Sequence, residues 1–279
     1  MFAIVGILVV FGAVAGGYLL EHGNLKVLLQ PAELLIIGGA AMGTIFIANP
    51  PTILKGILAG FKVVFGSSPF GKARYIETLK QIYAVMQKAR KGGLTELEND
   101  VENPEKSPLF EKWDHHVRDF VCDTLRMAMS GGPSPFDLDQ MMELDMEVHE
   151  HYAQLPVKAL NTVADSLPGL GIVAAVLGVV ITMGALGGPP EEIGHKVAAA
   201  LVGTFLGILL CYGLLGPMAA KMGKAAEEQG HFYHTVRVAL SAFLKGNAPA
   251  IAIEFARRAV PGHVRPTFKE LESAYRAKS

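Results

Sequence analysis

The sequence predicts an all-α, four-span integral membrane protein, with a large helical cytoplasmic insertion between spans two and three and a helical C-terminal tail. Four runs carry this prediction because they contain no Asp, Glu, Lys, Arg or His: Met1–Leu20, Leu34–Leu54, Ser166–Pro190 and Val197–Ala220. A helix needs roughly 20 mostly apolar residues to cross about 30 Å of hydrocarbon. Mean hydropathy is +0.34, and the charged residues lie outside the four runs.

The basic residues predict the orientation. The first run has no Lys or Arg before Lys26, so it lacks the positive start of a signal peptide and is expected to remain as a span. The connections Glu21–Glu33 and Glu191–Lys196 hold one Lys each, whereas ten Lys and Arg follow Ala220. Because cytoplasmic segments carry the excess of Lys and Arg, both termini are expected in the cytoplasm. The expected regions are a membrane hairpin (1–54), a cytoplasmic insertion (55–165), a second hairpin (166–220) and a cytoplasmic tail (221–279).

The cytoplasmic regions show helical periodicity and helix boundaries. One apolar series ends at Gly92-Gly93, and a second runs from Phe110 and Trp113 to Leu125. Ser134-Pro135-Phe136-Asp137 is typical of a helix start, and Thr267-Phe-Lys-Glu270 forms a capping box. No convincing alternating strand pattern is present.

Composition and motifs exclude several functions. A net charge of −1 argues against a nucleic-acid partner. The pairs His115-His116 and His149/His151 do not have the i, i+4 spacing that places two metal ligands on one helix face, so no metal site is expected. With no nucleophile elbow or phosphate loop, we expect neither an enzyme nor a cofactor. Because the uncharged runs define the spans, any moving ion must be carried by a partner's side chain.

Small residues, prolines and hydroxyls mark the last two spans. Frequent Gly and Ala allow close helix packing, within one subunit or against another. Pro168 and Pro217 are either functional bends or ordinary structural prolines. The hydroxyls of Thr182 and Thr204 lie deep in the spans, where bonding to a carbonyl one turn earlier is the simpler reading.

These blocks resemble the A subunit of the bacterial flagellar stator, the MotA/PomA family. The resemblance is carried by Asp165-Ser-Leu-Pro-Gly-Leu-Gly-Ile-Val-Ala-Ala-Val-Leu-Gly-Val-Val180, Val202–Gly213, Gly216-Pro217, Ala89–Glu98 and Gly246–Arg258, in collinear order. It implies a stator subunit in the bacterial inner membrane, an ion-driven motor component. Five copies would surround two helices of a B subunit (MotB), which supplies the membrane Asp, and the ring would push the rotor protein FliG.

The resemblance also assigns residues. Pro168 and Pro217 match prolines that couple the state of the Asp to ring conformation, and Thr204 matches a threonine on the ion path. Thr182 is also counted among the ion-path and coupling residues. Ala175 stands where sodium-type relatives carry threonine, so H⁺ is expected as the translocated ion rather than Na⁺.

Arg90 and Glu98 match a charged pair that engages the rotor. Without the family, both would be read as a solvated helix surface. The alternative function is an ExbB/TolQ-type proton-driven pump that energises outer-membrane processes, although such relatives typically have three spans. A self-sufficient channel is disfavoured by the uncharged spans.

Overall fold

The computed structural model describes the whole chain except residues 1, 112, 185–186, 188 and 277–279. Its described residues form helices and no strand, so the all-α prediction is confirmed. The chain divides into two compact units. We call residues 1–67 with 152–225 the membrane unit, and residues 68–151 with 226–279 the helical unit.

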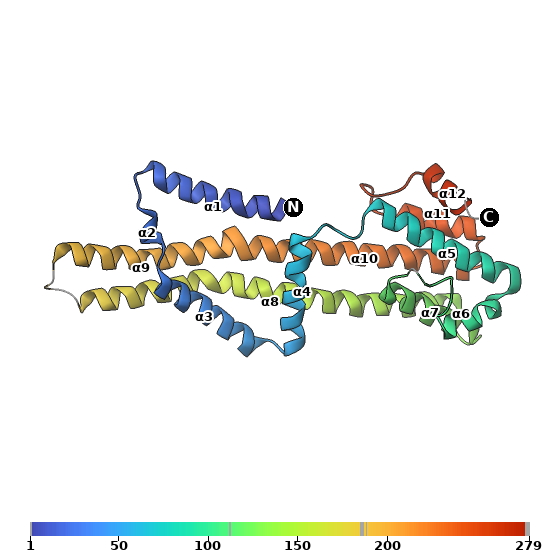
Figure 1. The fold of residues 1–279 in the computed structure, drawn as a ribbon. Helices are drawn as coiled ribbons and strands as arrows, with labels where there is room; N and C mark the ends of the chain where they lie inside the picture. Colours follow the sequence, from blue (N-terminus) through green and yellow to red (C-terminus); the bar gives the residue numbers. More distant parts are fainter. Residues whose placement is uncertain (1, 112, 185–186, 188, 277–279) are drawn as a thin grey trace. The chain divides into compact units, whose positions relative to one another are not determined.

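The membrane unit contains the helices that can span a bilayer (Figure 1). Its elements are α1 (Phe2–Leu20), α2 (Leu25–Leu28), α3 (Pro31–Ala48), α4 (Pro51–Phe65), the second part of α8 (Pro135–Met183), α9 (Pro190–Leu210), the π-helix η2 (Cys211–Leu215) and the start of α10 (Gly216–Leu244). Four described stretches are long and apolar enough to cross a membrane: Phe2–Leu20, Leu25–Ala48, Pro135–Met183 and Pro190–Leu244. Four spans are therefore confirmed, although Met1 and residues 185–186 and 188 of the predicted spans lie outside the described residues.

The second predicted span is wrong at both ends. Its helix α3 begins at Pro31, not Leu34, and ends at Ala48, where Asn49 is extended (φ −131°, ψ 139°). Asn49 precedes Pro50, and a proline disfavours the helical conformation of the residue before it. Pro51 then occupies the first position of a separate helix, α4.

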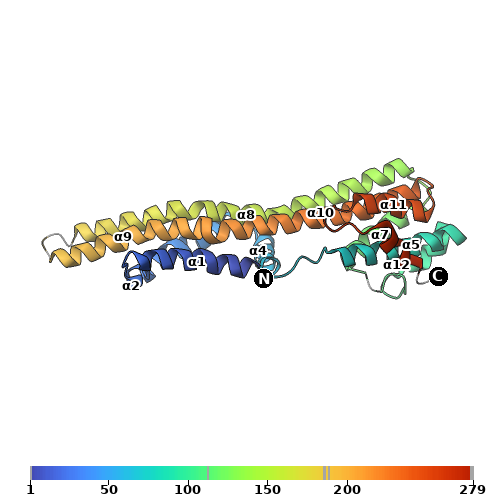
Figure 2. The same ribbon diagram turned by 90° about the horizontal axis from the view of Figure 1, so that it is seen from above.

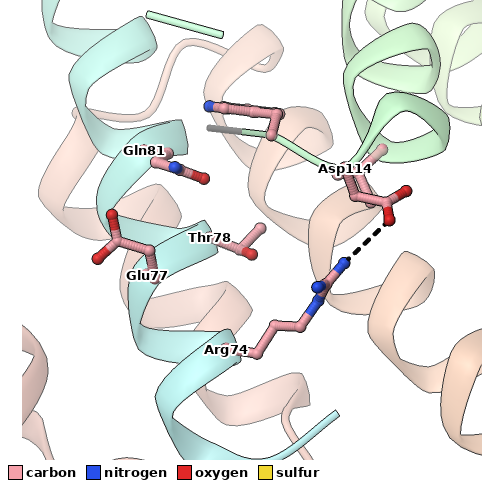
Figure 3. A pocket seen from close by; sticks show the side chains of 7 residues that line it. Arg74, Glu77, Thr78, Gln81 and Asp114 are labelled. Carbon is pink, nitrogen blue, oxygen red and sulfur yellow. Dashed lines mark ion pairs between the residues drawn. The ribbon is translucent and has the colours of Figure 1, made fainter. Parts of the chain in front are cut away.

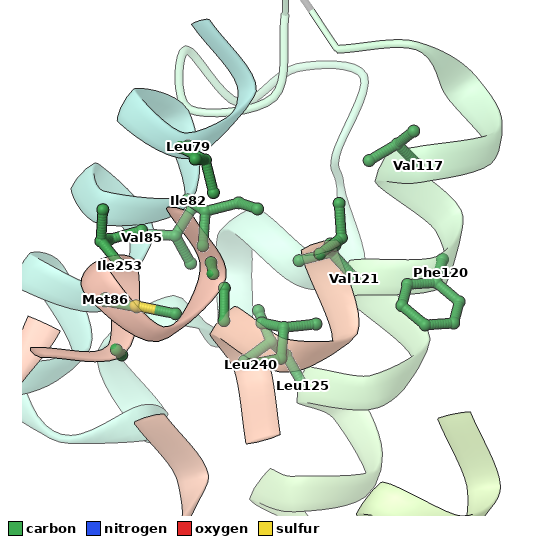
Figure 4. Close-up of a cluster of buried hydrophobic side chains, with 14 of the residues drawn as sticks. Leu79, Ile82, Val85, Met86, Val117, Phe120, Val121, Leu125, Leu240 and Ile253 are labelled. Carbon is green, nitrogen blue, oxygen red and sulfur yellow. The ribbon is translucent and has the colours of Figure 1, made fainter. Parts of the chain in front are cut away.

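The helical unit forms its own apolar core (Figure 4). Its elements are α5 (Lys72–Gly92), the 3₁₀ turn η1 (Leu94–Leu97), α6 (Glu98–Glu102), α7 (His115–Met129), the first part of α8, the second part of α10, α11 (Pro249–Ala259) and α12 (Phe268–Arg276). Gly93 ends α5 with φ +85°, a conformation that favours glycine. Leu79, Ile82 and Met86 of α5 are buried in the same cluster as Leu240.

Both predicted helix starts are confirmed. Ser134 and Asp137 exchange hydrogen bonds at the start of α8, and Thr267 and Glu270 do the same at α12. The second apolar series was predicted too long, however. Phe110 and Trp113 are buried but lie in turns, because Asp114 caps α7 by accepting a hydrogen bond from the His116 N–H at 3.1 Å.

Candidate functional site

The two long membrane helices meet along a seam of small residues. We define the glycine seam as Gly171, Ala174 and Gly178 on α8 with Ala200, Gly203 and Gly207 on α9. A Cβ placed on Gly207 would lie 2.5 Å from the Leu167 carbonyl oxygen, and one on Gly178 would lie 2.7 Å from the Ala200 Cβ. The helices run side by side in both views (Figures 1 and 2). The small residues therefore bring the two backbones into direct contact.

The seam brings together two predicted ion-path positions. A Cβ on Gly171 would lie 3.3 Å from the Thr204 Cα, and one on Gly203 would lie 3.2 Å from the Ala175 backbone nitrogen. Both residues are half-buried. Thr182 is buried near the end of α8, and its hydroxyl donates a 2.8 Å hydrogen bond to the Gly178 carbonyl. The Thr182 proton is thus engaged by its own helix, as the simpler reading expected.

The site includes a carboxyl group that the sequence interpretation missed. Glu33 lies in the first turn of α3, which packs against α9, and is only 6% exposed. A Cβ on Gly203 would lie 2.6 Å from the Glu33 Oε2, so this glycine makes room for the carboxyl group. The prediction that the spans contain no ionisable side chain is wrong here. Pro31 was the missed signal, because proline favours the first position of a helix and places Glu33 inside α3.

The two predicted prolines occupy different surroundings. Pro168 is half-buried inside α8, next to Leu167, whose carbonyl approaches Gly207. Pro217 is exposed and follows η2, in which the Gly216 N–H reaches back five residues to the Cys211 carbonyl. Because proline donates no N–H, the chain around Pro217 departs from regular α-helical bonding. An irregular turn of this kind is a place where a membrane helix can change conformation.

Arg90 and Glu98 lie on the helical unit, and both are exposed. Arg90 belongs to the last turn of α5 and Glu98 begins α6. No ion pair involves either charge in the part of the chain that the structure describes. Beside Arg90, a hollow of about 290 Å³ is lined mostly by apolar groups, among them Leu94 and Phe243.

A partly buried ion pair stabilises the segment that carries these charges. Lys88 contacts Asp100 at 2.6 Å, and the Ser107 hydroxyl donates to the same carboxylate at 2.6 Å. Burial raises the pKa of Asp100, but the hydrogen bonds from Lys88 and Ser107 outweigh it, so the pKa is lowered overall. Because Lys88 and Asp100 each stand two residues from a member of the exposed pair, they stabilise the backbone that presents Arg90 and Glu98.

The helical unit also has a polar pocket of about 240 Å³ (Figure 3). Arg74, Glu77, Thr78 and Gln81 line it from α5, and Asp114 lies opposite and pairs with Arg74 at 3.3 Å. The charges on its wall have mixed signs and the ion pair is partly exposed. Among the described residues, no group of three or more His, Cys, Asp or Glu is arranged to hold a metal ion.

Fold and site together define a four-span helical membrane protein with a close-packed helix pair and a separate charged helical unit. The family description "Motility protein A N-terminal" matches residues 4–93, and "MotA/TolQ/ExbB proton channel family" matches residues 112–234. Motility protein A of Escherichia coli K12 is 42% identical, covering 99% of this chain and 96% of that protein. Chemotaxis protein LafT of Vibrio parahaemolyticus is 35% identical, covering 96% of this chain and 95% of that protein. The chain therefore belongs to the motility protein A family, and these two relatives, which match almost its whole length, are a motility protein and a chemotaxis protein.

Two solved structures share the fold. C. jejuni MotAB matches with a TM-score of 0.77 and 20% identity, covering 95% of this chain and 98% of that chain. The flagellar MotAB stator complex of Bacillus subtilis matches with a TM-score of 0.73 and 24% identity, covering 96% and 97%. The predicted resemblance to the MotA family is confirmed.

Proposed function

We propose that the chain is the A subunit of a bacterial flagellar stator, which couples ion flow through the membrane to torque on the rotor. The observation that supports this proposal most strongly is the 42% identity to motility protein A of Escherichia coli K12 over 99% of the chain. The ExbB/TolQ-type pump is less supported, because the relatives that match almost the whole chain are motility and chemotaxis proteins.

In this proposal, five copies surround two helices of a B subunit, whose Asp carries the ion near the glycine seam. Thr204 and Ala175 face this path from α9 and α8, and H⁺ is the ion because the Ala175 methyl offers no oxygen ligand. Pro168 and Pro217 couple the state of the Asp to helix conformation. The seam supports this role because neither helix can shift there without moving the other.

The helical unit is proposed to lie in the cytoplasm, with both chain termini, and to engage FliG through Arg90 and Glu98. Two observations support this assignment: both charges are exposed without an ion pair among the described residues, and the Lys88–Asp100 pair at 2.6 Å stabilises their segment. An elementary charge crossing 100 mV releases about 2.3 kcal/mol, which is the energy available for each step.

Reconstitution in vesicles tests whether proton flux requires the B subunit. Vesicles containing this chain alone should show no proton flux, whereas vesicles containing the chain with its B subunit should acidify when a gradient is imposed. Glu33 at one end of α3 does not alter this expectation, since a single carboxyl group does not bridge a membrane of about 30 Å. Appreciable flux from the chain alone would contradict the proposal.

A further inference from the structure

Glu33 has an unusual environment for a carboxyl group. The residue is 6% exposed, and its Oε2 is enclosed without a hydrogen-bond partner among the described residues. Gly203 is one of the enclosing groups, since a Cβ on this residue would meet the Glu33 Oε2 at 2.6 Å.

Charged groups on the neighbouring elements do not neutralise Glu33. On α9, Glu192 pairs with Lys196 at 2.8 Å. Lys196 precedes Gly203 by about 10 Å of helix. Three more charged or titratable residues near the starts of α2 and α9 are exposed: Lys26, Glu191 and His195. On α8, the exposed Asp165 precedes Ala175 by roughly 15 Å of helix. Glu33 therefore has no counter-ion in the described part of the membrane unit.

Two opposing effects act on this carboxyl group. Burial without a partner disfavours the ionised form, because an unpaired charge loses its hydration. Its place in the first turn of α3 favours the ionised form, because helix N-termini carry partial positive charge. The Oε2 has no hydrogen-bond partner among the described residues, so nothing compensates the ionised form at this oxygen. A bound proton removes the charge that burial disfavours.

We propose that Glu33 is a proton-binding site at the external end of the ion path, which takes up a proton from outside and releases it toward the B-subunit Asp. The inference rests on the proposed function, which puts the Glu21–Glu33 connection outside. One O–H bond forms at the Glu33 carboxylate when hydronium gives up its proton, and the same bond breaks when water or the Asp accepts it. Gly203 keeps this carboxyl group beside Thr204 and Ala175, where the path passes.

The test uses the full chain reconstituted with its B subunit. Glu33→Gln keeps the shape and the neutral charge of the protonated form but cannot release a proton, so it should assemble and conduct at least roughly tenfold more slowly. Glu33→Asp, which retains a carboxyl group, should restore part of the flux. Glu21→Gln is the matched control, because Glu21 is exposed on the same connection and its loss should leave the flux unchanged.

Infrared difference spectra across a pH titration give a readout that does not depend on transport. The carbonyl stretch of a protonated carboxyl group should titrate in the wild type and in Glu33→Asp, and this contribution should vanish in Glu33→Gln. If the wild-type complex conducts and Glu33→Gln conducts equally well, or if the spectra of the two are identical, the inference is overturned. A wild-type complex that carries no protons would instead overturn the proposed function, while the infrared titration would still decide whether Glu33 binds a proton.

Discussion

Replacing Gly207 by alanine should force α8 and α9 apart. The added methyl would lie 2.5 Å from the Leu167 carbonyl oxygen and 3.0 Å from the Gly171 Cα. Carbon–oxygen contacts begin at about 3.3 Å, so the helices must separate by roughly 0.8 Å. Both contacts are backbone atoms, which cannot rotate away as a side chain can.

Such overpacking costs about 1–3 kcal/mol. Gly169 on α8 provides the matched control, because a Cβ there meets nothing within 4 Å. Gly169→Ala should therefore be neutral or stabilise the helix by up to about 1 kcal/mol. Because both variants replace a helical glycine by alanine, the gain in helix propensity cancels, and the two should differ by the overpacking cost of roughly 1–3 kcal/mol.

The assay is unfolding of the purified subunit in mild detergent by graded addition of SDS, followed by circular dichroism. Gly207→Ala should unfold at a lower SDS fraction than Gly169→Ala. It should also slow the motor, because the displaced backbone carries Thr204 less than one turn away. Equal stability of the two variants would show that the seam can relax, and the reasoning from backbone contact would then be refuted.

Three further predictions concern charge, acid and ion. Arg90→Glu and Glu98→Lys should each impair swimming, and compensating charge swaps in the rotor should restore it. The amount of protein in the membrane should stay normal, because an exposed charge contributes only about 0–1 kcal/mol to folding. Normal swimming by both variants would exclude the site. The pKa of Glu254 is lowered from 4.5 to about 2, chiefly by its hydrogen bonds with Arg257, so its stabilisation is complete above pH 4.5 and is lost toward pH 2. Glu254→Gln should reduce that acid dependence of unfolding by about 1–2 kcal/mol, less than the full shift implies because a quarter of the side chain is exposed; an unchanged acid profile would count against it. Swimming speed should follow the proton gradient and ignore external sodium, and collapse in sodium-free medium would show that Ala175 does not report the ion.

Local rules predicted the parts of the fold that are fixed by a few neighbouring residues. The capping box at Thr267 and Glu270 needs only two side chains and the adjacent backbone, and both bonds form: the Thr267 N–H donates to the Glu270 carboxylate and the Glu270 N–H donates to the Thr267 hydroxyl oxygen. Gly93 ends α5 because its φ of +85° is strained for other residues. The uncharged runs revealed the spans because the bilayer imposes both length and composition on any helix that crosses it.

The errors arose where hydropathy and helix geometry disagree. The uncharged run continues through Asn49 and Pro50, but α3 ends at Ala48 because a proline disfavours the helical conformation of the residue before it. A charged residue stopped the apolar run at Glu33, although the helix had already begun at Pro31. Only the tertiary contact of α3 with α9 shows that this charge is buried, and no one-dimensional pattern contains that contact.

The small residues of α8 serve two different faces. Gly171 and Gly178 pack against α9 of the same chain. A second stripe at helical spacing stays open: Gly169 has no neighbour within 4 Å of its Cβ position, and Val173, Val176 and Val180 are 50%, 56% and 62% exposed. Helix α1 likewise has no buried residue. Apolar surface of this extent is stable against lipid or another apolar helix but not against water, so these two faces are available to lipid and to the helices of the proposed ring around the B subunit.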